Sequence, residues 1–373
     1  MKALILAGGK GTRLRPLTYT CPKGLIPLAN RPFLEYQLDL LRKSGIEQVI
    51  LSLNYMAERF KEALGNGKRW GLSFEYSVED RPLGTGGAVS RCSSLVGNER
   101  VVVVNGDVLT DVDLGKMLEF HLEKGSDITI AMAEVPDPTA YGLILTDGTQ
   151  RVVRFLEKPG WDEVEGNTIN AGIYIIEPDG LSRISEQVKR LGRERDPSES
   201  KAEVSLERDL FPVFLAEGRK IYGYRIEGYW QDIGTLPKYI QAHRDILDMR
   251  LDVVPPGRRF GRGIRIGKNS SIHQSVELRG PVLIGDRASI GAYTRLGPWT
   301  VIGHDVEVGR ETRIVNSIVL DHVQIRDGAR LTWCILGERV DVGSGCCLEG
   351  AVLGSRTVLS RGSCTVELRE LVR

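Results

Sequence analysis

Residues 2–18 read KALILAGGKGTRLRPLT, and this stretch decides the fold of the first part of the chain. Residues 2–7 form a short apolar run, which predicts a buried β-strand. The run leads into the glycines Gly8, Gly9 and Gly11 and into clustered cations, which include Arg13, Arg15 and Lys23. Glycine lets backbone amides approach an anion closely, and nearby cations neutralise its charge. The stretch therefore predicts a strand followed by a phosphate-binding loop.

Strand-like and helix-like segments alternate up to about residue 247. The apolar spacing of residues 32–45 and 114–124 predicts helices, and the valine run at 101–104 predicts a central strand buried on both faces. This β-α-β order predicts a mostly parallel, Rossmann-like sheet with helices on both faces. Ligands of such sheets bind beyond the carboxyl ends of the strands, so the residues after 7 and after 104 are expected to meet there.

A different pattern begins after residue 263. An aliphatic residue recurs every six positions at Ile266, Ile272, Leu278, Ile284, Ile290, Leu296, Ile302, Val308, Ile314 and Leu320. From about Val308 the repeat becomes a coil of 17 residues. Such a period predicts a parallel β-helix whose core is a ladder of stacked aliphatic side chains.

Three segments follow from these patterns. Residues 1–250 are the predicted catalytic domain, residues 251–263 a linker containing Pro255-Pro256-Gly257, and residues 264–373 the β-helix with a short tail. The apolar tail at 368–372 is expected to cap the last coil.

Composition limits the classes of function. The net charge of +1 over 373 residues argues against a nucleic-acid-binding surface. No apolar stretch approaches the ~20 residues that a membrane span needs, and the N-terminal run is too short for a signal peptide. The six cysteines have no metal-binding spacing, which favours free thiols in a reducing cytoplasm.

Two aspartates are candidate ligands for a metal ion. Asp107 follows the valine strand, and Asp232 lies in the stretch EGYWQDIGT at 227–235. Mg²⁺ is held by one or two carboxylates together with phosphate oxygens and waters. A helix cap for Asp107 and a turn before a helix for Asp232 are the competing explanations.

A second glycine loop, PLGTGGA at 82–88, precedes a predicted helix. Its backbone can approach a nucleobase, and a helix N-terminus favours anionic groups. The competing explanation is a tight turn between a strand and a helix.

The motif GGKGTRL, followed by PLT and PK, resembles the signature of the sugar-1-phosphate nucleotidyltransferases, also called nucleotide-sugar pyrophosphorylases. The resemblance continues through LGT at 83–85, NGD at 105–107, EKP at 157–159, INAG at 169–172 and EGYW at 227–230. It implies a nucleotidyltransferase domain followed by a left-handed hexapeptide β-helix. Gly24 and residues 86–88 depart from the family pattern where selectivity for the base is expected.

The resemblance also implies a role for each candidate residue. Arg13, Lys23 and Asp107 would be catalytic, and Asp107 and Asp232 would hold Mg²⁺. The residues expected to bind nucleotide are Leu6, Gly8, Gly9, Gly11, Thr12, Gly84, Thr85, Gly86 and Gly87. The residues expected to bind the sugar phosphate are Tyr141, Gly142, Glu157, Lys158 and Asn170.

The reaction implied is transfer of a nucleotidyl group from a nucleoside triphosphate to a sugar 1-phosphate, with pyrophosphate released. The motifs are most similar to the GDP-mannose-forming branch, which uses GTP and mannose 1-phosphate. Glucose 1-phosphate or another sugar 1-phosphate with UTP, dTTP, CTP or ATP remains an alternative, and assembly into a homo-oligomer through the β-helix is expected.

Two further functions are possible: a second enzymatic activity on the β-helix, or a non-catalytic regulatory role for the whole chain. Some pyrophosphorylases carry an acyltransferase with a catalytic histidine on such a helix, for which His273, His304 and His322 are available. Other relatives are non-catalytic subunits that sense nucleotide-sugars, and such chains usually lose part of the glycine-loop or metal set. Here Gly8 to Arg13, Lys23, Asp107 and Asp232 are all present, which favours an active enzyme.

Overall fold

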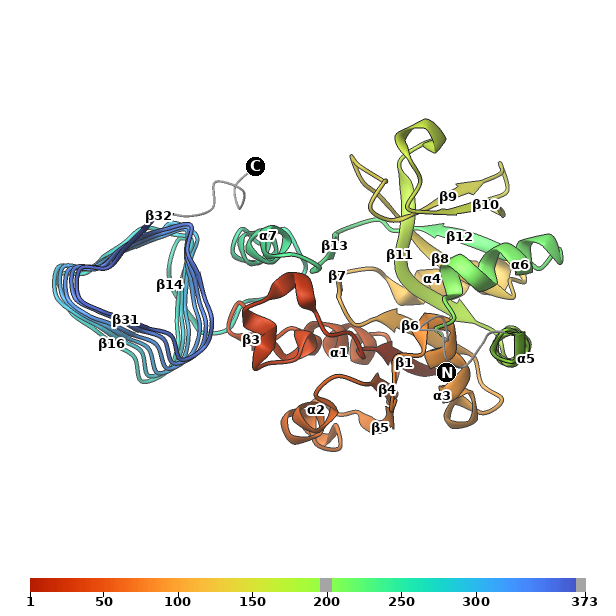
Figure 1. Ribbon diagram of the computed structural model, residues 1–373, viewed down its shortest axis with the longest axis horizontal. Coiled ribbons are helices and arrows are strands. Elements are labelled where there is room, and N and C mark those ends of the chain that lie inside the picture. The colour runs from red at the N-terminus through yellow and green to blue at the C-terminus, as the bar shows by residue number, and fades with distance from the viewer. Residues whose placement is uncertain (195–202, 367–373) are drawn as a thin grey trace. The chain divides into compact units, whose positions relative to one another are not determined.

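The computed structural model describes residues 1–194 and 203–366, and the chain forms two compact units (Figure 1). The first unit comprises Met1–Gly9 and Tyr36–Trp230, and the second comprises Lys10–Glu35 and Gln231–Arg373. The segment that follows the first strand is thus grouped with the C-terminal part of the chain, although it lies within the predicted catalytic domain.

The first unit is built on a mixed sheet with strand order β10-β9-β11-β6-β1-β4-β5, in which β8 also pairs with β11 and β12 with β8. Its strands are β1 (Lys2–Leu6), β4 (Gln48–Leu53), β5 (Ser73–Val78), β6 (Val101–Asn105), β8 (Ile128–Glu134), β9 (Gly142–Thr146), β10 (Val152–Glu157), β11 (Thr168–Ile176) and β12 (Ile221–Arg225). The predicted central valine strand is confirmed, because β6 lies between β1 and β11 and its valines are buried.

The expectation of a mostly parallel sheet is right for only part of it. Strands β5, β4, β1 and β6 run parallel, whereas β11 is antiparallel to β6, β8 and β9. Between β8 and β11 the chain forms the β9–β10 hairpin and no crossover helix. Parallel neighbours need such a crossover, so β11 runs antiparallel to its neighbours, whereas β12 pairs parallel with β8.

Helices cover the sheet of the first unit. The helices of the chain up to residue 216 are α1 (Leu34–Lys43), α2 (Ala57–Leu64), α3 (Gly84–Val96), α4 (Leu114–Lys124), α5 (Pro178–Glu194) and α6 (Phe211–Ala216). Apolar side chains of α3, α5 and α6 form one buried cluster with those of the sheet, including Val89, Ile184 and Phe211. The predicted helix at 114–124 is confirmed, and it begins at the N-cap Asp113, whose carboxylate accepts a hydrogen bond from the amide of Lys116.

Short elements complete the first 235 residues. They are the strands β2 (Pro27–Leu28), β3 (Arg31–Pro32), β7 (Val108–Thr110) and β13 (Trp230–Asp232), the 3-10 turns Thr12–Leu14, Leu17–Tyr19, Lys23–Leu25, Lys68–Trp70 and Trp161–Glu163, and the π-helical turn Leu206–Leu210. Among the described residues, no helix is long and apolar enough to cross a membrane.

The second unit contains the predicted parallel β-helix, which is confirmed. Each coil adds one strand to each of three sheets, and the coils stack into a triangle when seen down their axis (Figure 1). One sheet consists of β14 (Arg258–Gly261), β15 (Ile264–Ile266), β18 (Val282–Ile284), β21 (Thr300–Ile302), β24 (Ile318–Val319), β27 (Ile335–Leu336) and β30 (Val352–Leu353). The second consists of β16 (Ser271–Ile272), β19 (Ser289–Ile290), β22 (Glu307–Val308), β25 (Gln324–Ile325), β28 (Asp341–Val342) and β31 (Val358–Leu359). The third consists of β17 (Glu277–Leu278), β20 (Arg295–Leu296), β23 (Arg313–Val315), β26 (Arg330–Thr332), β29 (Cys347–Glu349) and β32 (Cys364–Val366).

The predicted ladder of aliphatic residues is present in register. Ile302 pairs with Val319, Val319 with Leu336, and Leu336 with Leu353, so the later coils contain 17 residues, as the sequence indicates. The strand β14 lies inside the predicted linker 251–263 and pairs antiparallel with β15 at the start of the helix. The tail at 368–372 lies outside the described residues.

Helix α7 (Leu236–Leu247) also belongs to the second unit and carries a buried histidine. The His243 Nδ1 lies 2.9 Å from the carbonyl oxygen of Tyr239, and among the described residues its buried Nε2 has no hydrogen-bond partner. Burial lowers the pKa of His243 to about 4. The ring is therefore neutral in the folded protein at neutral pH.

This pKa makes stability depend on pH. Below the ordinary histidine pKa of 6.5, His243 is protonated in the unfolded chain but stays neutral in the folded protein. The free energy of unfolding therefore falls as the pH drops from 6.5 to about 4. The full shift corresponds to about 3 kcal/mol. We expect His243→Gln to reduce this part of the pH dependence in urea denaturation measured at several pH values. His273→Gln, at an exposed ring, is the control, and an unchanged slope in His243→Gln would contradict the assignment.

Candidate active site

The loop after β1 and the loop after β6 emerge at the same edge of the first unit's sheet, as predicted. Leu6 of β1 pairs with Asn105 of β6, and the amide of Gly106 donates a 2.8 Å hydrogen bond to the carbonyl oxygen of Leu6. A Cβ placed on Gly106 would lie 2.7 Å from that oxygen, so only glycine allows the approach. The arrangement brings Gly8, Gly9 and Asp107 to one edge, where ligands of α/β sheets bind.

The surroundings of Asp107 fit a hard cation. The Asn105 Oδ1, two residues earlier, is buried and has no hydrogen-bond partner among the described residues. Buried polar atoms are normally satisfied, so an oxygen of this kind, two residues from the half-buried Asp107, is suited to an ion or to its water shell. Within residues 1–194 and 203–366, no group of three or more His, Cys, Asp and Glu side chains could hold a metal ion. Metal binding at Asp107 therefore requires oxygens from the substrate, which is how Mg²⁺ is usually held.

The second glycine loop packs against the chain around Val204. The amides of Gly86 and Gly87 donate hydrogen bonds of 2.8 and 3.1 Å to the carbonyl oxygen of Val204. A Cβ on Gly84 would lie 2.5 Å from the same oxygen. Close packing therefore explains why glycine is needed at these positions, and two of the amides are already engaged. The role of Gly84, Thr85, Gly86 and Gly87 in nucleotide binding stays a prediction.

A hydrogen-bond network connects this loop to the predicted sugar site. The Glu207 carboxylate accepts hydrogen bonds from Thr85 Oγ1 at 2.6 Å and from Tyr174 Oη at 2.8 Å. Tyr174 Oη in turn accepts one from Asn170 Nδ2 at 2.8 Å. Glu207 thus connects Thr85, which is predicted to bind nucleotide, through Tyr174 to Asn170, which is predicted to bind the sugar phosphate. Sequence reasoning missed it because no motif surrounds it.

The predicted sugar-phosphate residues Tyr141, Gly142, Glu157 and Lys158 lie together. A Cβ on Gly142 would meet the Glu157 carboxylate at 3.0 Å, and the Lys158 amide donates to the carbonyl oxygen of Tyr141 at 2.9 Å. Lys158 has a φ of 51°, a strained conformation for this residue type that is often found at functional sites. The Tyr141 ring packs edge-on against Trp230, at 5.6 Å between centroids.

Desolvation and charge repulsion raise two pKa values in this region. Glu157 keeps an exposed surface, but neighbouring groups withdraw water from its carboxyl, and this desolvation together with the charge of Glu207 raises its pKa. The pKa of the buried Tyr174 hydroxyl is also raised, by burial and by Glu207, so Tyr174 acts as a hydrogen-bond donor.

We expect Glu207→Gln to loosen this network. The substitution places an amide group where the structure requires an acceptor, which costs about 1–3 kcal/mol of unfolding free energy. It also removes the negative charge that raises the pKa of Glu157, so that pKa should fall. Chemical denaturation and an NMR titration of the Glu157 carboxyl measure the two effects. Glu165→Gln, at an exposed ion pair with Arg154, is the matched control. Unchanged stability and an unchanged Glu157 pKa would contradict the assignment.

In the second unit the segment that is predicted to bind phosphate folds on itself. Gly11 has a φ of 60°, and a Cβ there would lie 3.0 Å from Thr18 Cγ2 and 3.2 Å from Lys23 Cβ. The Thr18 hydroxyl donates to the carbonyl oxygen of Gly11 at 2.8 Å. Gly11 therefore permits a tight turn that brings the stem of Lys23 beside the loop, and Thr12 begins the next 3-10 turn.

Arg13 and Asp232 meet around Gly234 in the same unit. A Cβ on Gly234 would lie 2.7 Å from the Asp232 carboxylate and 3.0 Å from Arg13 Nη2, so glycine leaves the room that both side chains occupy. Lys238, from the first turn of α7, forms an ion pair with Asp232. Gly234 and Lys238 were not among the site residues predicted from the sequence. They lie only two and six residues after Asp232, and this closeness could have indicated them.

These features define an enzyme of a particular class. A strand leading to a glycine loop, nearby cations, carboxylates and a further group of polar side chains are the parts needed for phosphoryl or nucleotidyl transfer. Residues 2–249 match the model of the family described as nucleotidyl transferase, and residues 278–368 match the model of the GMPPB C-terminal domain. The chain belongs to the nucleotidyl transferase family. Members of this family generally use a divalent metal ion.

Known relatives and structures resemble the chain over most of its length. It is 37% identical to a mannose-1-phosphate guanylyltransferase of Mycobacterium tuberculosis, covering 87% of this chain and 81% of the relative. It is 33% identical to a UTP–glucose-1-phosphate uridylyltransferase of Synechocystis, covering 89% and 86%. A crystal structure of a putative glucose-1-phosphate thymidylyltransferase from Bacillus anthracis superposes with a TM-score of 0.58 at 27% identity, covering 70% of this chain and 97% of that one.

Proposed function

We propose that this protein transfers GMP from GTP to mannose 1-phosphate, releasing pyrophosphate and forming GDP-mannose. The observation that carries the proposal is the similarity to the mycobacterial guanylyltransferase over 87% of the chain, combined with a match to the GMPPB C-terminal domain. Two contacts within one unit support the chemistry, since Gly11 lies beside Lys23 and Arg13 beside Asp232.

The reaction needs no nucleophilic side chain. A phosphate oxygen of the sugar 1-phosphate attacks the α-phosphorus of the triphosphate, a new P–O bond forms, and the bond to the β-phosphate breaks in line. Arg13 neutralises the departing β- and γ-phosphates, while Lys23 holds the α-phosphate or the incoming sugar phosphate. The amides of Gly8, Gly9 and Gly11 bind the triphosphate.

The sugar side is positioned by the first unit. Lys158 pairs with the sugar phosphate, Glu157 accepts hydrogen bonds from sugar hydroxyls, and Asn170 contacts the hexose. Asp107 and Asp232 are the proposed ligands of Mg²⁺, which when bound neutralises phosphate charge.

Glucose 1-phosphate with another triphosphate is the second candidate, since relatives named for uridylyl and thymidylyl transfer also resemble the chain. The test is pyrophosphate release from GTP, UTP, dTTP, CTP and ATP, each with mannose, glucose and glucosamine 1-phosphate. The proposal expects the highest kcat/KM for GTP with mannose 1-phosphate. A higher value for any other pair overturns the choice of substrates, and no release from any pair overturns the reaction.

Acyl transfer by the β-helix and a purely regulatory role receive less support. Both ring nitrogens of His304 face groups of this chain, which does not suit a catalytic base for acyl transfer. A regulatory subunit does not require the complete set of Arg13, Lys23, Asp107 and Asp232.

Assembly and compartment are part of the same proposal. The end of the β-helix presents an exposed Val358 and partly buried Leu353 and Leu359, which favours pairing with a second copy. Light scattering on the full chain should give a multiple of 41.3 kDa, and a monomer at every concentration overturns this part. The described cysteines form no disulfide bonds, which supports a reducing, cytoplasmic setting.

A further inference from the structure

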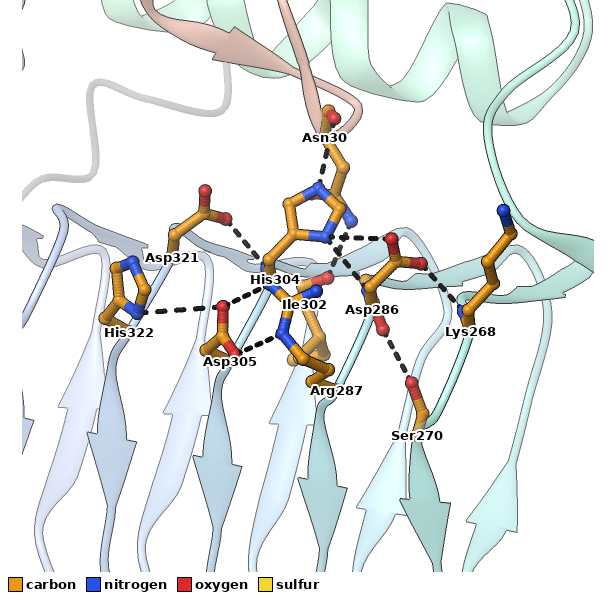
Figure 2. Close-up of polar contacts among 11 residues, drawn as sticks. Asn30, Lys268, Ser270, Asp286, Arg287, Ile302, His304, Asp305, Asp321 and His322 are labelled. Carbon is orange, nitrogen blue, oxygen red and sulfur yellow. Dashed lines mark hydrogen bonds and ion pairs between the residues drawn. The ribbon is translucent and has the colours of Figure 1, made fainter.

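Residues 10–35, here called the signature segment, carry Gly11, Arg13 and Lys23 and belong to the same compact unit as the β-helix. The segment ends in the small β2–β3 hairpin, whose turn is Ala29–Asn30. Both turn residues have positive φ, 47° and 60°, as in the tight turns that join two strands. This geometry places Asn30 at the tip of the hairpin, where it meets the β-helix (Figure 2).

Asn30 makes two contacts with one coil of the helix. Its side-chain amide donates a 2.8 Å hydrogen bond to the carbonyl oxygen of Ile302, and its own carbonyl oxygen lies 3.4 Å from His304 Nε2. The first contact joins the Asn30 side chain to the main chain of the coil, and the second joins the Asn30 main chain to the His304 side chain. Together they define the position and the orientation of the hairpin tip. The tip is therefore held at a single corner of the helix.

The neighbouring coils fix the ring of His304. Its Nδ1 accepts a 3.0 Å hydrogen bond from the amide of Asp286 in the preceding coil, so in the neutral ring the proton is on Nε2 and points to Asn30. The amide of His304 donates at 2.7 Å to a carboxylate oxygen of Asp321 in the following coil. His322, one coil further, faces Asp305 at 3.8 Å instead (Figure 2).

A second attachment lies along the same corner. The Thr20 hydroxyl donates to Ser355 Oγ at 3.1 Å, and a Cβ on Gly354 would lie 3.2 Å from Pro16 Cβ. The ladder from Ile302 to Leu353 spans three coil steps, which corresponds to about 14 Å along the helix axis. Tyr239 of α7 adds a third contact by donating to the carbonyl oxygen of Pro27.

We propose that the β-helix is a platform for catalysis, in which Asn30 and His304 act as positioning residues for Arg13 and Lys23. The mechanical link is short, because Ile26 donates to the carbonyl oxygen of Lys23 at 3.3 Å and β2 begins at the next residue, Pro27. Lys23 then packs beside Gly11. The proposal rests on the nucleotidyltransferase function and goes beyond it, since it assigns the C-terminal repeats a part in the reaction.

The test uses full-length Asn30→Gly, which keeps the positive φ of the turn and removes only the side-chain amide, together with His304→Ala. Each variant should lower kcat/KM with the triphosphate about three- to tenfold, the range expected for one lost hydrogen bond, with part of the loss in kcat. The double variant removes both hydrogen bonds that hold the tip, so it should be impaired more than either single variant. His322→Ala, a histidine of the next coil that faces away from the hairpin tip, should match the wild type.

Hydrogen exchange separates this proposal from the proposed function. Amides of residues 10–28 should exchange faster than in the wild type in Asn30→Gly and His304→Ala, and at the wild-type rate in His322→Ala. This expectation holds whether or not the substrates are correctly identified. Unchanged exchange overturns the attachment. Faster exchange with unchanged KM and kcat overturns the positioning role, and so do variants whose only defect is a lower melting temperature. A wild type with no turnover overturns the proposed function, and with it the catalytic part of the platform, while the exchange result still decides the attachment.

Discussion

Asp107→Asn is expected to lower the rate of pyrophosphate release by about two to three orders of magnitude. The substitution keeps the size and hydrogen-bonding capacity of the side chain but removes the charge that a divalent metal requires. Because Asp107 follows the buried strand β6 and lies outside the core, the melting temperature should stay near that of the wild type. Steady-state release of pyrophosphate and a thermal melt measure the two outcomes.

Asp113→Asn is the matched control for this variant. Asp113 caps helix α4 through the amide of Lys116, and asparagine caps a helix about as well as aspartate. Its activity should therefore remain within about twofold of the wild type, as for most surface substitutions. Near-normal turnover in Asp107→Asn would contradict the assignment of this carboxylate to the metal.

Arg13→Ala is expected to lower kcat/KM by about two to three orders of magnitude, with much of the loss in kcat. The Arg13 guanidinium lies beside Asp232 at Gly234, and the proposed mechanism requires it to neutralise charge that accumulates on the departing pyrophosphate. Such an interaction is stronger in the transition state than in the ground state, so the rate is affected more than binding. Initial rates over a range of GTP concentrations measure the two parameters.

Arg15→Ala is the control for Arg13→Ala. The Arg15 guanidinium lies over the ring of Tyr19, 5.0 Å from its centroid, and the side chain is exposed. Removing it also removes one positive charge from the signature segment, so it corrects for the general electrostatic effect. Equal losses in both variants would show that Arg13 has no specific role.

Local periodicity made much of the architecture predictable. The β-helix follows from its six-residue repeat, because every coil must place an aliphatic side chain inward, and Ile302, Val319 and Leu336 stack in the expected register. The meeting of Gly8 and Asp107 at one edge follows from the parallel pairing of β1 and β6, which two apolar strands separated by helices already indicate.

Features that depend on contacts between distant residues were not predictable. The antiparallel pairing of β11 follows from the β9–β10 hairpin, whose strands look like any other apolar runs. Glu207 enters the site through Thr85 and Tyr174, which are far from it in sequence. The attachment of Asn30 to Ile302 joins residues 272 positions apart, and no pattern in either stretch points to the other.

The central claim is that the chain joins a nucleotide to a sugar phosphate. The most direct measurement is a ³¹P NMR spectrum of the purified full-length protein with GTP, mannose 1-phosphate and Mg²⁺. The account predicts that signals of a pyrophosphate diester and of free pyrophosphate grow in equal amounts, while those of both substrates decline together. Formation of GDP and inorganic phosphate alone, or an unchanged spectrum with this pair and with every other triphosphate and sugar 1-phosphate tried, would contradict it.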